Sequence, residues 1–139
     1  MMSDAVRAFL AQNHNAVLTT FRRNGAAQMS IVTCGPFRDG VACTTTAGRA
    51  KLTNLLRDPR CSLMVSQADW RGYVVLEGRA TVLSAETTDA EELRLALRDV
   101  YRAAASSEHP DWEEYDRAMR EDGRVAIVVT PEHVYGTRV

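Results

Sequence analysis

Apolar positions recur along this chain with two different spacings, which divide it into short elements. A spacing of three to four residues is typical of amphipathic helices, and it marks the segments 4–13, 48–58, 88–104 and 111–121. Runs rich in β-branched and aromatic residues, several with alternating polarity, predict strands at 16–22, 26–34, 40–45, 61–67, 73–84 and 124–139. The order is therefore one helix, three strands, a helix, two strands, two helices and a last strand.

Turn residues between these runs predict how the strands pair. Asn24-Gly25 separates the first two strands, and this step is a strong hairpin signal. Pro131 interrupts the last strand, which suits an edge or a bulge. Short connections favour a mainly antiparallel sheet, and six strands in so short a chain favour a barrel. We expect an α+β fold with helices on the rim, forming one domain over residues 1–139.

Composition and charge narrow the class of protein. Apolar residues make up 45% and charged residues 25%, and the formal net charge is −1, whereas nucleic-acid-binding domains usually carry a strong basic bias. The start of the chain does not resemble a signal peptide, and no run approaches the length of a membrane helix. Cys34, Cys43 and Cys61 form no CxxC pair, so we expect no disulfide framework. The expectation is a cytoplasmic protein with neither nucleic acid nor membrane as a partner.

Several kinds of active site are poorly supported. His14, His109 and His133 lie far apart, and none stands at metal-ligand spacing from a cysteine or carboxylate. No nucleophile elbow, zinc-protease motif, phosphate loop or dinucleotide fingerprint occurs. We therefore expect no metal, and we assign no catalytic residue.

The stretch TTTAGRAKLTN, residues 44–54, is electrically unusual. If a helix starts near Gly48, Arg49 and Lys51 lie in its first turn, where unpaired N–H groups already carry roughly half a positive charge. The stretch also supplies hydroxyls from Thr44, Thr45 and Thr46. It is either a solvated basic turn capped by threonines, or an anion site in which helix N–H groups, Arg49 and Lys51 hold a phosphate.

Two other groups of residues each allow a structural interpretation and a functional one. Gln28 and Ser30 share one face of the second predicted strand, so they either face water or reach the edge of a heterocycle lying across it. Trp70 and Tyr73 lie around the turn before the fifth strand, where an aromatic side chain is able to cover a flat ligand or a partner subunit.

A family resemblance joins these segments. TTTAGRAKLTNLLRDPRCSLMVS, LTTFRRNGAAQMS, YVVLEGRATVL, SSEHPDWEEYDRAM and PEHVYGTRV together resemble the pyridoxamine 5′-phosphate oxidase-like split-barrel proteins. The match extends to the flavin/deazaflavin oxidoreductases that bind coenzyme F-420. It implies a six-stranded split β-barrel that forms a homodimer, with two cofactor sites at the subunit interface.

The resemblance also implies roles for individual residues. Arg49 and Lys51 match the pair that holds the cofactor phosphate, and Thr44, Thr45 and Thr46 match the backbone along the ring and ribityl chain. Further matches are Gln28 and Ser30 under the deazaflavin, Trp70 and Tyr73 in a loop from the second subunit, and His109 near the site. Two features depart from the pattern: Ile31 stands where an asparagine is expected, and the tryptophan loop is offset by about one residue.

The implied activity is hydride transfer from reduced coenzyme F-420 to a small electron-poor conjugated acceptor. The proton would come from solvent or from Tyr73. Arg22, Arg23 and Arg57 are candidate contacts for the acidic tail of that coenzyme. The alternatives are an FMN-binding oxidase or electron carrier with the same fold, and a non-catalytic flavin-binding protein.

Overall fold

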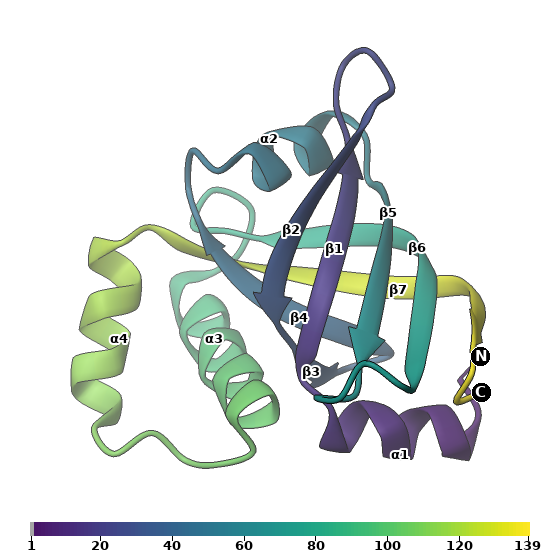
Figure 1. Cartoon of the computed structure of the whole chain (residues 1–139). Coiled ribbons are helices and arrows are strands. Elements are labelled where there is room, and N and C mark those ends of the chain that lie inside the picture. Colours follow the sequence, from purple (N-terminus) through teal and green to yellow (C-terminus); the bar gives the residue numbers. More distant parts are fainter. Residues whose placement is uncertain (1) are drawn as a thin grey trace.

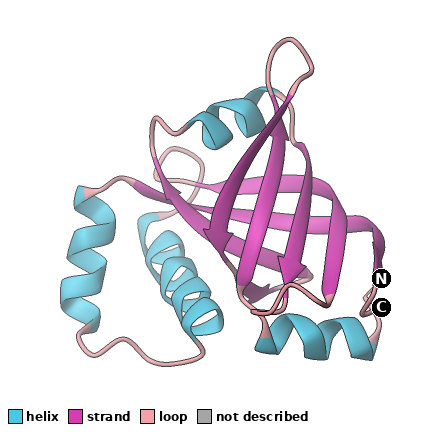
Figure 2. Cartoon of the chain, in the orientation of Figure 1, coloured by secondary structure: helices cyan, strands magenta, loops and turns pink. Residues whose placement is uncertain are grey.

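The computed structural model describes residues 2–139. Four helices and seven strands occur in this part of the chain (Figures 1 and 2). In order they are α1 (Asp4–Gln12), β1 (Asn15–Phe21), β2 (Ala27–Thr33), β3 (Gly35–Phe37), β4 (Gly40–Thr46), α2 (Ala50–Arg57), β5 (Arg60–Ser66), β6 (Tyr73–Leu83), α3 (Ala90–Ala105), α4 (Trp112–Glu121) and β7 (Arg124–Gly136).

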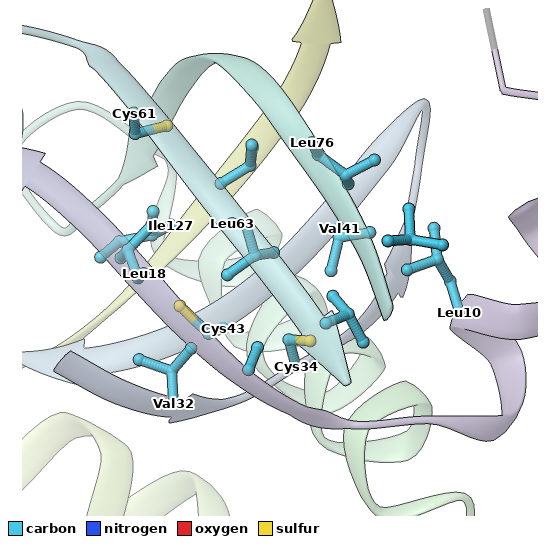
Figure 3. Packing of buried hydrophobic residues seen from close by; sticks show 14 of the residues in the cluster. Leu10, Leu18, Val32, Cys34, Val41, Cys43, Cys61, Leu63, Leu76 and Ile127 are labelled. Carbon is cyan, nitrogen blue, oxygen red and sulfur yellow. The ribbon is translucent and has the colours of Figure 1, made fainter. Parts of the chain in front are cut away.

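All seven strands belong to one antiparallel sheet with the order β2-β1-β5-β6-β7-β4-β3. The sheet curls. This follows from its packing, in which Val32 of β2 and Cys43 of β4 belong to the same core cluster (Figure 3). In a flat sheet these two strands would lie about 24 Å apart, five times the usual strand spacing. Leu18, Leu63 and Ile127 fill the interior between them. The predicted α+β fold, a mainly antiparallel split β-barrel with peripheral helices, is confirmed.

The strand count of six is wrong, because Gly35–Phe37 forms a seventh strand in a hairpin with β4. Glycine and proline argue against a strand in the sequence, but β3 is the edge of the sheet, where proline is tolerated. Gly35 is needed for packing: a Cβ there would lie 2.3 Å from the carbonyl carbon of Ala103 in α3. The glycine lets this helix lie directly on the edge strand.

Pro131 lies at a β-bulge, which is one of the two positions, an edge or a bulge, that the sequence predicted for it. Glu77 pairs with His133 and Gly78 pairs with Pro131, so Glu132 is an extra residue on β7. The strand itself lies between β6 and β4 and is not an edge.

The helices close the two ends and one side of the half-barrel. Helix α1 covers one end through Val6 and Leu10, and α2 covers the opposite end (Figure 1). Helices α3 and α4 lie beside the sheet, where Leu97 and Tyr115 pack with Val128 in a second apolar cluster. Helix α2 packs against both β1 and β2, so it lies near the edge of the sheet that β2 forms.

Candidate functional site

The first turn of α2 carries positive charge with no acidic compensation. Its N-cap is Arg49, whose side chain makes no capping hydrogen bond, and the first turn holds no acidic residue. Gly48 precedes it with φ +85°, a left-handed conformation that glycine adopts readily. The three other helices each begin with a serine or aspartate whose side chain accepts N–H bonds. Within residues 2–139, α2 is therefore the one helix start without a side-chain cap.

Arg49 and Lys51 form no ion pair within the described part of the chain. Arg49 is exposed, and its Nε donates to Thr46 Oγ1 at 3.3 Å. Lys51 is half-buried, and its ammonium lies close enough to Cys43 to counteract the rise in the thiol's pKa. Burial dominates and raises the pKa of Cys43 to about 12. The two cations thus flank the end of β4, one outside and one beside the barrel interior.

Gln28 and Ser30 lie on the inner face of the half-barrel, not on the water-facing one. They pair with Thr20 and Leu18 of β1, which are both fully buried. Ser30 Oγ is buried and makes no hydrogen bond in residues 2–139, although a buried hydroxyl normally has a partner. Gln28 Oε1 accepts a 2.8 Å hydrogen bond from Arg22 Nε. A ligand with polar atoms would supply the missing hydrogen-bond partner of this hydroxyl on the sheet edge.

The departure at Ile31 does not affect this inner face. Ile31 and Met29 alternate with Ser30 and point outward, with 83% and 66% of their surface exposed. The outward direction separates the unexpected isoleucine from the face that carries Gln28 and Ser30.

The three threonines of β4 divide between two faces. Thr45 follows Cys43 on the inner face and is 3% exposed. Thr44 and Thr46 follow Ala42, which packs in the cluster beside α3 and α4. The structure therefore brings Thr45 to the interior, next to the strand end that Lys51 approaches.

A buried polar pair fixes α2 over the barrel, and the sequence reading missed it. Asn54 Nδ2 donates to Thr20 Oγ1 at 3.1 Å, and Arg57 Nη2 donates to the carbonyl of Phe21. Asn54 lies close to Leu52, Leu55 and Leu56 in a short helix. A polar residue among these leucines was the sign in the sequence of a buried hydrogen bond. Arg57 thus anchors the helix, Arg22 bonds Gln28, and Arg23 stands exposed in the hairpin turn.

Trp70 and Tyr73 lie at the other end of the sheet from α2. Ser66, the last residue of β5, pairs with Asn15 at the start of β1, whereas α2 sits at the Phe21 end. Six residues of strand separate these ends, about 20 Å. Trp70 has φ +64° and is 66% exposed. One chain alone does not bring these aromatics to Arg49 and Lys51.

His109 packs inside an aromatic cluster of its own chain. Its ring lies 5.1–5.6 Å from those of Tyr101, Trp112 and Tyr115, and its Nδ1 accepts the N–H of Asp111 at 2.9 Å. The loop belongs to the end of the molecule where Ser106 bonds His14, away from α2. Its predicted contact with the cofactor stays a prediction.

Over 2–139, no group of three or more His, Cys, Asp or Glu side chains is placed to hold a metal ion. In the same range no helix has the length and apolar character needed to cross a membrane.

The curled antiparallel sheet, with α2 packed over β1 and β2, is a small split β-barrel. The chain belongs to the pyridoxamine 5′-phosphate oxidase family, whose sequence model matches residues 2–138. It is 36% identical over 100 residues to an F-420H(2)-dependent biliverdin reductase of Mycobacterium tuberculosis (strain CDC 1551 / Oshkosh), covering 70% of this chain and 72% of that protein.

Solved structures agree on the fold. A conserved hypothetical protein of Mycobacterium tuberculosis matches with a TM-score of 0.78 at 20% identity, over 99% of this chain and 86% of that one. An F-420 reductase matches with a TM-score of 0.66 at 20% identity, over 96% and 98% of the two chains. At this level of identity, both likenesses concern the fold alone.

Proposed function

We propose that this protein is an oxidoreductase that uses reduced coenzyme F-420 to reduce a small, electron-poor conjugated acceptor. The observation that carries the proposal is the pair of cations Arg49 and Lys51 at the uncapped start of α2. This helix packs against the edge strand β2, where the Ser30 hydroxyl is buried and unpaired. The biliverdin reductase relative, whose name includes the coenzyme, supports the choice of cofactor.

The residues present match the chemistry of a phosphorylated deazaflavin. Arg49 and the first N–H groups of α2 would hold the phosphate, with Lys51 adding a second charge from the barrel side. Ser30 and Gln28 would bond polar atoms at the ring edge, which gives the buried hydroxyl its missing partner. When bound, the coenzyme supplies a hydride, so the chain itself needs no nucleophile or metal.

The protein's own contribution would be orientation and exclusion of water. Asn54 and Arg57 hold α2 in place over β1, which fixes the phosphate position. The inner face beyond Ser30 is apolar, with Leu18 and Val32 buried there. A proton for the product would come from solvent or from Tyr73, which the described chain holds by a hydrogen bond from its N–H to Thr137 Oγ1.

A second copy of the chain is part of the proposal. The outer face of the sheet carries an apolar row across five strands, connected through the pairing of Ile31, Val17, Met64, Val75 and Tyr135. Two of these side chains, Ile31 and Tyr135, are well exposed in the isolated chain. Apolar rows of this kind mark interaction surfaces. A homodimer through this face would also let Trp70 and Tyr73 of one subunit reach the cofactor of the other.

FMN is the second candidate cofactor, because the family is named for pyridoxamine 5′-phosphate oxidase and the phosphate site would serve either molecule. With FMN the protein would be an oxidase or an electron carrier. A non-catalytic flavin-binding protein would use the same contacts without turnover.

Titration and turnover separate these functions. The purified protein is titrated with F-420 and with FMN, and reduced F-420 is then followed by absorbance with a panel of enones, quinones and a linear tetrapyrrole. The proposal predicts tighter binding of F-420 and protein-dependent oxidation of the reduced coenzyme by at least one acceptor. Preferential FMN binding would instead favour the flavin alternative. Binding of F-420 without turnover on any acceptor would favour the non-catalytic one.

A further inference from the structure

A cavity of about 750 Å³ lies on the side of α2 that faces α3 and α4. It is bounded by α2, the loop after β6, and helices α3 and α4, and its volume falls within the range of small-molecule sites. On α2, Lys51, Asn54 and Leu55 share the face turned to the barrel, whereas Leu52, Thr53 and Leu56 line the cavity. Lys51 and the cavity therefore lie on different faces of one helix, whereas Arg49 lies at the end of α2 that borders the cavity through Gly48.

The lining of the cavity is largely apolar. The large apolar side chains in the wall are those of Leu52, Leu56, Val82, Leu93, Leu97 and Met119. Leu56 projects from α2 with 68% of its surface exposed. An apolar molecule inserted between α2 and α4 would cover this side chain, which nothing in residues 2–139 covers.

The charged groups around the cavity are of two kinds. Arg94 is fully engaged, because it bonds Glu91 and Asp116, and Asp116 also binds Arg98. These four groups compensate one another and leave no net charge. The acid Glu86 stands exposed in the loop after β6.

Arg120, in the last turn of α4, and Arg124, the first residue of β7, do not belong to this network. Arg120 lines the cavity and takes part in no ion pair within the described chain. Arg124 Nε is buried and donates no hydrogen bond in residues 2–139, and Asp122 Oδ2 lies 3.9 Å from it, beyond hydrogen-bond range. A buried guanidinium N–H without an acceptor is costly. The Arg124 side chain as a whole is 32% exposed and lines the cavity, so an anionic group there would compensate its charge.

We propose that this cavity is a second binding site, for an apolar organic anion whose charged group meets Arg124 and Arg120 while its body lies against Leu52, Leu56 and Met119. The proposal does not depend on the cofactor or on the reaction. The site shares Ala47 and Gly48, the segment that leads into α2, with the phosphate site. An occupant would therefore contact the same helix that positions Arg49 and Lys51.

A matched pair of fluorescent probes tests the site. Anilinonaphthalene sulfonate carries the anion, and N-phenylnaphthylamine has nearly the same rings without it. We expect one sulfonate probe to bind per chain. Arg124→Gln and Arg120→Gln should each weaken it by about tenfold, the low end for a hydrogen bond to a charged group, with little change for the neutral probe.

Blocking and control variants complete the design. Thr53→Trp places a large side chain at an exposed cavity-facing position and should abolish binding of both probes. Lys51→Ala, on the barrel face of α2, should leave probe binding unchanged, and Arg120→Gln should leave F-420 affinity unchanged. Sulfonate-probe affinity that is equal in the wild type, Thr53→Trp and both arginine variants would overturn the proposal, whatever the outcome for F-420. Equal loss of both probes in the arginine variants would overturn its anionic part.

Discussion

Asn54 of α2 donates a 3.1 Å hydrogen bond from Nδ2 to the hydroxyl oxygen of Thr20 in β1, and both side chains are buried. This contact ties the cationic helix start to the strand that pairs with Gln28 and Ser30. It links the two halves of the proposed cofactor site through one bond inside the core.

Asn54→Ala should destabilise the fold by about 1–3 kcal/mol, because it leaves the Thr20 hydroxyl buried without its donor. Urea unfolding measures the change. The double variant Thr20→Val with Asn54→Leu removes both polar groups and should recover much of the loss. Equal stability of Asn54→Ala and the wild type would mean that the bond contributes nothing.

Asp116 should make stability depend on acid pH. Its carboxylate accepts from Arg98 Nε at 2.9 Å and from Arg94 Nη1 at 3.2 Å, and these bonds, Arg98 first, hold its pKa below the ordinary value of about 3.9. Because the folded pKa is the lower one, the contribution is complete above the unfolded pKa. It is lost as the pH falls through the folded pKa.

Asp116→Asn should therefore cost roughly 2–3 kcal/mol at neutral pH, less than a fully buried pair because both arginines are partly exposed. Unfolding curves at neutral pH and near pH 3 measure the effect. The difference between wild type and variant should shrink at the lower pH. A difference that stays constant over this range would contradict the assignment.

The three cysteines should be unreactive in the native state. Burial raises the pKa of Cys34, Cys43 and Cys61 to about 12 in each case, so little thiolate exists at pH 8. A thiol-reactive chromophore should label none of them before denaturation and all three after it. Rapid labelling of one thiol in the native protein would show that the barrel interior opens.

The apolar row on the outer face should mediate self-association. Ile31→Lys places a charge at its most exposed position and should shift the protein from dimer to monomer in light scattering. The matched control is Leu95→Lys, an exposed leucine on α3 away from the row, which should leave the mass unchanged. Dimers that persist in Ile31→Lys at low concentration would place the interface elsewhere.

Periodicity predicted most of the fold, and it failed where tertiary contacts decide. Gly35-Pro36-Phe37 has poor strand propensity, yet it pairs because α3 needs a residue without a side chain at that edge. The inner position of Gln28 and Ser30 depends on which face of β2 carries Val32, and this alternation was readable in the sequence. The distance between Trp70 and Arg49 could not be predicted from the sequence, because it depends on the two segments lying at opposite ends of the sheet, a whole strand apart.

The phosphate affinity of α2 tests the central claim most directly. Isothermal titration of F-420 into Arg49→Ala and Lys51→Ala should show losses of roughly 1.5–3 kcal/mol each, about ten- to a hundred-fold in Kd, with unchanged folding. Arg7→Ala, an exposed arginine of α1 at the opposite end of the barrel, is the control and should change affinity far less. Wild-type affinity in both α2 variants would contradict the account.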